Sequence, residues 1–209
     1  PGQDEVATDA EALREAGYPD LYEGRSPAWV TRFQQTTPPV MAKGVEDTAL
    51  YRYFPLACLN EVGGEPDRFG RTPEEFHVVM LDRAQRWPHA LSSSSTHDTK
   101  RSEDVRARIN VLSEVPELWA ARVEAWAGFN ARHKQSEDGQ PIPDPNDEYL
   151  LYQTLVGAWP FDEVDDQARQ DLVQRLQAYM EKATREAKTH TSWINPNAAY
   201  DEGLAALDR

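Results

Sequence analysis

The segment TPEEFHVVMLDRAQRWP, residues 72–88, contains the clearest fold signal in this sequence. Its first four residues form a capping box, with a proline at the first helical position. Behind the box, the side chains of one face recur at the helical i, i+3, i+4, i+7 spacing, and Pro88 ends the run. They are Phe76, Val79, Met80, Arg83, Ala84 and Trp87. The segment therefore predicts an amphipathic helix.

Helices of the same kind are predicted on both sides of this segment. One opens at Ser26-Pro27 and is closed by Pro38-Pro39. Another runs from about residue 166 to residue 188, and its apolar stripe consists of Leu172, Leu176, Tyr179, Met180, Ala183 and Ala187. Further amphipathic helices are predicted at residues 11–16, 47–54, 103–113, 116–133 and 147–156.

Strand signals are nearly absent. Only residues 90–96 resemble a short extended segment, and their serines are weak strand formers. Residues 136–146 contain Gly139 and three prolines, which is typical of a solvent loop and marks the clearest internal boundary. We therefore expect a mainly α fold with at most one short strand. A helical segment over 1–135 and another over 147–209 would flank the loop and form one compact unit.

Composition limits the classes of function. The 209 residues include 36 acidic and 22 basic side chains, for a net charge of −14, which disfavours binding to nucleic acid or to an anionic membrane. No apolar run approaches the roughly 20 residues of a membrane span. The single cysteine, Cys58, excludes an internal disulfide and a multi-cysteine metal site. We expect a soluble protein of the cytoplasm without a cofactor. Because the chain begins at Pro1-Gly2 and not at Met, we also expect it to be a piece of a longer protein.

His97 and Asp98 are the first candidates for chemistry. They follow the serine run 92–95 and precede the charged start of a helix. A chain that leaves a core strand and turns into a helix at this point places such side chains on an exposed lip, where barrel enzymes do their chemistry. Alternatively, Asp98 or Ser102 caps the helix that begins near Glu103, and His97 is an ordinary loop residue. The residue pattern by itself favours the cap.

Two other segments combine charged or polar groups. Lys43 precedes Gly44, with two acids following, but the pattern of a phosphate-binding loop is missing, and acids in the first turn of a helix explain the charges equally well. Residues 190–197 place polar groups around Trp193, and we interpret them as a docking loop that buries this tryptophan. The other histidines are scattered without ligand spacing, so no metal site is predicted.

Four stretches of the sequence resemble a known family. Residues 39–53, 59–64, 95–106 and 191–197 are similar, in the same order, to stretches of the maltooligosyltrehalose synthases, which belong to the α-amylase superfamily. The resemblance covers most of the chain between residues 29 and 200. It is specific to this subgroup, because several long and nearly contiguous motifs agree.

The resemblance implies an activity. Enzymes of this family convert the reducing-end α-1,4 bond of a maltooligosaccharide into an α,α-1,1 bond by intramolecular transglycosylation with retention. Chemistry of this kind needs a carboxylate nucleophile and an acid/base carboxylic acid about 5 Å apart. No cofactor or metal is implied. The functional partner enzyme implied is maltooligosyltrehalose trehalohydrolase, without a stable complex.

The resemblance also assigns roles to residues. His97 and Asp98 are similar to the last signature of the amylase superfamily, after barrel strand seven. Asp98 thereby looks like the third catalytic carboxylate, which grips hydroxyls of the reacting glucose, and His97 looks like a donor to the same sugar. This overturns the cap as the preferred interpretation. The resemblance implies four residues that line the substrate pocket: Lys43, Arg52, Lys100 and Arg101.

Important parts of the family pattern are missing. The nucleophilic aspartate after strand four and the acid/base glutamate after strand five have no counterpart, since Glu46 and Glu61 stand in the wrong context. We therefore expect helical insertions excised from the later part of a (β/α)8 barrel, inactive as a separate chain because a single strand cannot close a barrel. The alternative is a non-catalytic helical module that binds maltodextrin or another protein.

Overall fold

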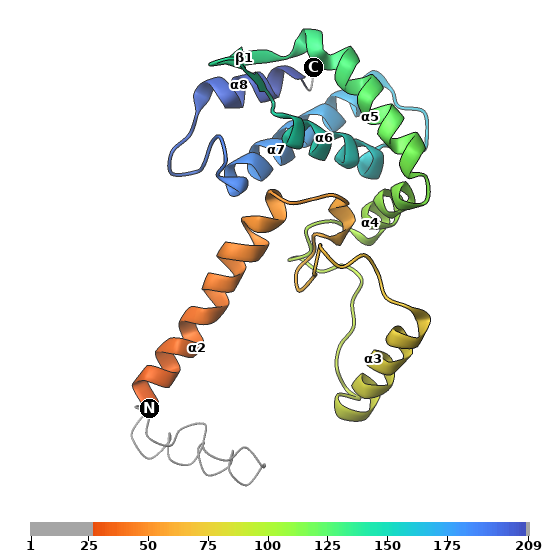
Figure 1. The fold of residues 1–209 in the computed structure, drawn as a ribbon, viewed down its shortest axis with the longest axis vertical. Coiled ribbons are helices and arrows are strands. Elements are labelled where there is room, and N and C mark those ends of the chain that lie inside the picture. Colours follow the sequence, from red (N-terminus) through yellow and green to blue (C-terminus); the bar gives the residue numbers. More distant parts are fainter. Residues whose placement is uncertain (1–26, 208–209) are drawn as a thin grey trace. The chain divides into compact units, whose positions relative to one another are not determined.

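A computed structural model of the chain describes residues 27–207, and it confirms a mainly helical fold (Figure 1). The expected helix at residues 11–16 lies outside the described residues. The chain divides into two compact units, Pro1–Gly44 and Val45–Arg209. The boundary expected at 136–146 therefore lies inside the second unit. No helix in the described part is long and apolar enough to cross a membrane.

In the first unit the described residues form helix α2, Pro27–Met41, and the start of the π-helical turn Ala42–Glu46, whose last two residues belong to the second unit. The prediction that Pro38-Pro39 close the helix is wrong, because both prolines lie inside α2. The helix thus continues through both prolines, although each removes an N–H donor and crowds the carbonyl four residues earlier.

The core of the second unit is built by four helices: α4 (Glu103–Asn110), α6 (Pro145–Ala158), α7 (Asp166–Ala187) and α8 (Ala198–Leu207). Helix α6 packs between α4 and α7, and α8 packs on α7. The predicted stripe of α7 is confirmed, since all its residues are buried except Tyr179, which packs against the core from a half-buried position. Among the most buried side chains are Ile109, Leu150 and Met180.

A glycine allows the close approach of α4 and α6. A Cβ added at Gly157 would lie 2.7 Å from Cγ1 of Val105 and 3.2 Å from the side chain of Ile109. Real Cβ atoms do not approach other atoms this closely, so a larger residue would force the two helices apart.

Helices α3 (Pro73–Arg86) and α5 (Pro116–Asn130) confirm two more predictions. The short helix η4, Val111–Glu114, extends α4, and η5, Ala131–His133, extends α5. The capping box of α3 forms as expected, because Thr72 accepts from the Glu75 N–H while the Glu75 carboxylate accepts from the Thr72 N–H. No side chain of α3 is buried. The apolar stripe of α3 is therefore uncovered by the part of the chain that the structure describes.

The position predicted for the strand is wrong. Residues 90–96 form no strand. The guanidinium groups of Arg83 and Arg106 donate hydrogen bonds to the carbonyls of Leu91 and Ser94, which would be acceptors in a β-sheet. The strands lie in the expected loop instead, as the antiparallel hairpin β1 (Gln135–Glu137) and β2 (Gln140–Ile142). Its two-residue Asp138-Gly139 turn has both φ angles positive, at 50° and 79°, as such a hairpin requires.

The helix predicted at residues 47–54 is also wrong. This segment contains only the 3₁₀ turn η2, Ala49–Tyr51. The side-chain amide of Asn60 donates to the carbonyls of Leu50 and Tyr53, each at 2.7 Å. Pro55 disfavours the helical conformation at the residue before it. A second 3₁₀ turn, η3 (Ala57–Leu59), completes the segment that packs on α4.

Candidate functional site

The loop Ser94–Arg101 lies in the connection from α3 to α4 and presents the two residues that sequence similarity singled out. His97 and Asp98 are both exposed. Neither side chain makes a hydrogen bond or an ion pair with any other residue in the range 27–207. The carboxylate and the imidazole are thus available to a ligand.

The interpretation of Asp98 or Ser102 as a helix cap is wrong. Ser102 occupies the N-cap position of α4 but its side chain makes no capping bond. The Ser95 hydroxyl instead accepts from the Glu103 N–H at 2.9 Å. The start of α4 therefore does not use the Asp98 carboxylate.

A tight turn holds the tip of the loop. The Thr99 hydroxyl donates to the Thr96 carbonyl at 2.8 Å, and the Thr96 hydroxyl accepts from the Asp98 N–H at 3.2 Å. The Thr99 N–H returns to the same Thr96 carbonyl at 3.3 Å. These bonds fix the backbone on both sides of His97 and Asp98.

Glu61 holds the end of the loop. Its Oε1 accepts from the Lys100 N–H at 2.7 Å, and its Oε2 accepts from the Arg101 N–H at 3.3 Å. Oε2 also lies 3.3 Å from Nη1 of Arg106. The sequence excluded Glu61 as a catalytic carboxylate, and the structure shows that this carboxylate is engaged with protein donors.

Three of the four predicted pocket residues, Lys100, Arg101 and Arg52, bind other groups of the protein. Lys100 Nζ lies 3.0 Å from Oδ1 of Asp47, and only 13 % of its side chain is exposed. Arg101 donates to the Ala57 carbonyl at 3.1 Å and to the Tyr179 hydroxyl at 2.5 Å. These two cations hold the loop onto the core, and their role in a substrate pocket stays a prediction.

Arg52 lies at the end of α7. It donates to the carbonyl of Ala187 at 2.5 Å and to that of Lys188 at 3.3 Å, and so satisfies carbonyls that a helix terminus leaves open. Lys43, the remaining predicted pocket residue, lies in the π-helical turn that follows α2.

The expectation that the loop 190–197 buries Trp193 is wrong, because this side chain is 54 % exposed. Its indole N–H donates to Glu186 at 3.1 Å, and the Arg185 guanidinium lies 4.9 Å from the centre of its ring. Both partners belong to α7, so the tryptophan lies along that helix with one side open.

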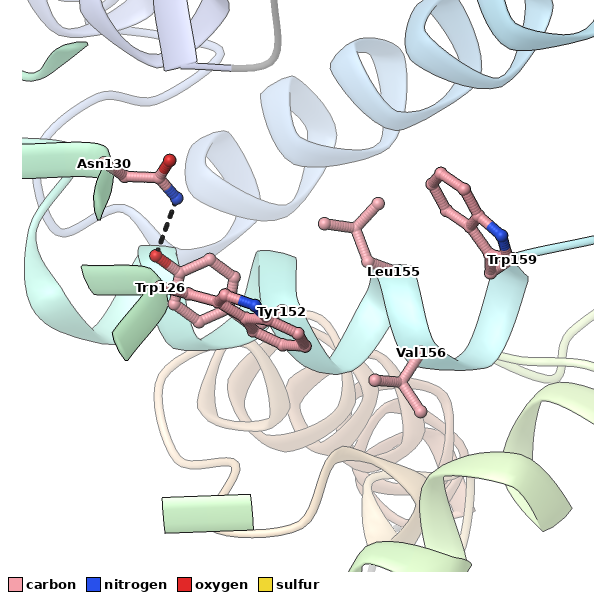
Figure 2. Close-up of a pocket in the computed structure, with 6 residues that line it drawn as sticks. All are labelled: Trp126, Asn130, Tyr152, Leu155, Val156 and Trp159. Carbon is pink, nitrogen blue, oxygen red and sulfur yellow. Dashed lines mark hydrogen bonds between the residues drawn. The ribbon is translucent and has the colours of Figure 1, made fainter. Parts of the chain in front are cut away.

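One apolar hollow beside α5 is lined by no predicted site residue. A pocket of about 420 Å³ lies between α5 and α6, and Figure 2 shows its aromatic side chains with Leu155 and Val156 between them. The Asn130 amide donates to the Tyr152 hydroxyl at 2.9 Å. The lining carries no charged side chain. It consists of Trp126, Asn130, Tyr152, Leu155, Val156 and Trp159.

A second cluster of titratable groups was missed by sequence reasoning. Ligand-type atoms of Asp144, Asp147 and His190 lie within 4.8 Å of one another. His190 Nε2 is 2.7 Å from Asp144 Oδ2, and the Tyr200 hydroxyl donates to Asp147 Oδ2 at 2.5 Å. The other Asp144 oxygen caps α6 by accepting from the Asp147 N–H at 2.7 Å. The cluster therefore joins α6 to α8. Sequence spacing gave no sign of it, because its members come from distant segments.

This cluster predicts a pH-dependent stability. Burial raises the pKa of the Asp147 carboxyl from 3.8 to about 6. The hydrogen bond from Tyr200 lowers this pKa, the charge of Asp144 raises it further, and the charge of His190 lowers it. The folded state then binds its proton more tightly than the unfolded state. Stability from this group is present below pH 4 and is lost as the pH rises through 6, by about 3 kcal/mol.

The variant Asp147→Asn removes this titration. Its stability minus that of the wild type should increase by about 3 kcal/mol between pH 4 and pH 7, as measured by urea unfolding at each pH. The exposed Asp104 offers a control, since Asp104→Asn should show a nearly constant difference. A constant difference for Asp147→Asn as well would contradict the raised pKa.

Comparison with known proteins shows which proteins this chain is similar to. No family model matches the chain. It is 46% identical over 181 residues to proteins of two Mycobacterium tuberculosis strains, CDC 1551 / Oshkosh and H37Rv, that are assigned as maltooligosyl trehalose synthases. The match covers 87% of this chain and 22% of each relative.

Solved structures agree with this similarity. A Sulfolobus tokodaii protein described as a hypothetical maltooligosyl trehalose synthase matches with a TM-score of 0.72 at 41% identity, over 84% of this chain and 23% of its own. The maltooligosyltrehalose synthase of Arthrobacter ramosus matches with a TM-score of 0.72 at 39% identity, over 98% of this chain and 25% of its own. The chain thus spans about a quarter of the length of these relatives.

Proposed function

From the premise that this chain is similar over most of its length to one segment of the maltooligosyl trehalose synthases, we propose that it is part of such an enzyme. The longer enzyme that would contain this segment is the complete synthase. Its reaction would convert the reducing-end α-1,4 bond of a maltooligosaccharide into an α,α-1,1 bond.

The reaction balances without a co-reactant. A nucleophilic carboxylate outside this chain attacks the anomeric carbon, and the α-1,4 bond breaks as an acid gives its proton to the departing oxygen of the terminal glucose. That glucose then turns, its anomeric hydroxyl attacks the glycosyl-enzyme, and the hydroxyl proton returns to the carboxylate that acted as acid. Both anomeric centres keep the α configuration.

The observation that supports this role is the combination of a fixed backbone and two exposed side chains in the loop Ser94–Arg101. Its tip is fixed by backbone and threonine hydrogen bonds, yet the side chains of His97 and Asp98 are left open. Held in this way, the Asp98 carboxylate would accept hydrogen bonds from hydroxyls of the reacting glucose, and His97 would donate to the same sugar. Pre-organised groups of this kind stabilise a transition state without reorganisation at the moment of reaction.

The proposal predicts a difference between the chain and the complete synthase. On maltopentaose, the complete synthase should consume reducing ends without net hydrolysis, while the 209-residue chain should show no turnover. Reducing-sugar assay with chromatography of the products measures both. Turnover by the chain alone, or hydrolysis as the main reaction of the complete synthase, would contradict the proposal.

A non-catalytic maltodextrin-binding module is the second candidate. The neutral aromatic hollow between α5 and α6 favours it, because tryptophan faces stack on sugar rings. Calorimetric titration of the 209-residue chain with maltopentaose separates the two. Micromolar binding by the chain alone favours the module, and binding only by the complete synthase favours the enzyme segment.

A further inference from the structure

We propose that Glu61 is a positioning residue for Asp98, acting through the backbone of the loop Ser94–Arg101. The inference rests on the proposed function, since it concerns how the same site is held in its active geometry. Glu61 belongs to the segment between η3 and α3, so its contacts with the loop join parts of the chain that are distant in sequence.

Both oxygens of the Glu61 carboxylate are used. In addition to the Lys100 N–H, Oε1 accepts from the Val62 N–H at 3.0 Å. Oε2 accepts from the Arg101 N–H and from the Arg106 guanidinium, each at 3.3 Å. Only 16 % of the Glu61 side chain is exposed, so these charge-assisted bonds are partly shielded from water.

Arg106 connects the two ends of the loop. One of its nitrogens binds the Glu61 carboxylate at the outgoing end, and another donates to the Ser94 carbonyl at the incoming end. The Glu61–Arg106 pair therefore clamps the residues before and after the catalytic tip. Asp98 lies between these two anchored ends, and the threonine turn leaves it little freedom of its own.

The backbone of Glu61 is also fixed. The Gly64 N–H donates to the Glu61 carbonyl at 2.7 Å, and Gly63 adopts a positive φ of 71°. A Cβ at Gly64 would lie 2.8 Å from that carbonyl oxygen. Glycine, which has no Cβ, therefore allows this tight turn. A rigid support behind Glu61 is what a positioning residue needs.

The substitution Glu61→Gln tests the role with almost no change of shape. The glutamine oxygen replaces one acceptor, but its NH₂ group cannot accept from the donors that face the other oxygen. The end of the loop should then shift, and a misplacement of about 1 Å can cost about 10²-fold in rate. We expect the complete synthase to lose about 10²-fold in kcat with little change in KM, because the bonds made by Asp98 strengthen mainly in the transition state.

A double-mutant cycle separates positioning from general stability. In the Asp98→Asn background, Glu61→Gln should cause little further loss of single-turnover rate, because the group that it positions is already gone. An equal loss in both backgrounds, or no loss in either, would overturn the proposal. If Asp98→Asn itself leaves the activity intact, the proposed function is contradicted. This result differs from an equal loss in both backgrounds, which contradicts only the positioning role of Glu61.

Glu75 supplies the matched control. Its carboxylate accepts from the Thr72 N–H at 2.9 Å and binds Arg68 at 3.1 Å, but these bonds hold the start of α3. Glu75→Gln should leave kcat within about twofold of the wild type. The melting temperature of each variant shows whether a loss of rate comes from unfolding, and a Glu61→Gln rate restored by lowering the temperature would also count against positioning.

Discussion

Replacing Asp98 with asparagine in the complete synthase should lower kcat/KM for maltopentaose by about 10³-fold. The hydrogen bonds that this carboxylate would make to the glucose tighten in the oxocarbenium-like transition state and are worth several kcal/mol, or about three powers of ten in rate. Asparagine keeps the shape but loses the charge and one acceptor oxygen. The fold should be unaffected, because the Asp98 side chain makes no bond within the described range 27–207.

Turnover of reducing ends and thermal unfolding check this prediction together. Asp104→Asn is a suitable control, since Asp104 is another exposed aspartate in the same region, in the first turn of α4. The control should stay within about twofold of the wild type. Retention of even a tenth of the activity by Asp98→Asn would contradict the role given to this carboxylate.

The largest effect on stability is expected from Gln153→Leu. The side chain of Gln153 is completely buried, and its amide oxygen accepts from the Ala57 N–H at 2.7 Å while its amide nitrogen donates to the Phe54 carbonyl at 3.1 Å. Leucine offers neither an acceptor nor a donor, so both backbone groups would stay buried without partners. Each of the two groups costs about 1–3 kcal/mol, so the variant should lose about 2–6 kcal/mol of unfolding free energy.

Urea unfolding of the 209-residue chain measures this loss. Gln167→Leu provides the comparison on an exposed helix surface, where the side-chain amide donates to Asp171 at 2.9 Å. That control should change the unfolding free energy by less than about 0.5 kcal/mol. A loss below about 1 kcal/mol for Gln153→Leu would mean that the segment between η2 and η3 is not held to α6 by this amide.

Local signals in the sequence predicted most helices. The capping box at Thr72 and the stripe of α7 act within a few residues, so a reader of the sequence can find them without knowing the fold. The Asp138-Gly139 turn was an equally local signal of a hairpin. It was missed because the neighbouring prolines favoured a loop, although Pro141 is tolerated in a short edge strand.

The site was only partly predictable, since its support comes from distant residues. Similarity of sequence singled out His97 and Asp98, and the structure leaves both of them open to a ligand. Sequence similarity could not show that Glu61 binds the loop, because the two segments are about 40 residues apart in the chain. Nor could it show that Asp47 and Tyr179 engage the side chains of Lys100 and Arg101, whose place in a substrate pocket stays a prediction.

We infer that Asp98 belongs to a glycosyl-transfer site completed by other parts of a longer enzyme. A crystal structure of the complete synthase with a bound maltooligosaccharide tests it most directly. We expect both Asp98 carboxylate oxygens within about 3 Å of hydroxyls of one glucose, with His97 donating to the same sugar and Glu61 still bound to the Lys100 and Arg101 N–H groups. An Asp98 carboxylate that contacts only solvent or protein in that complex would contradict it.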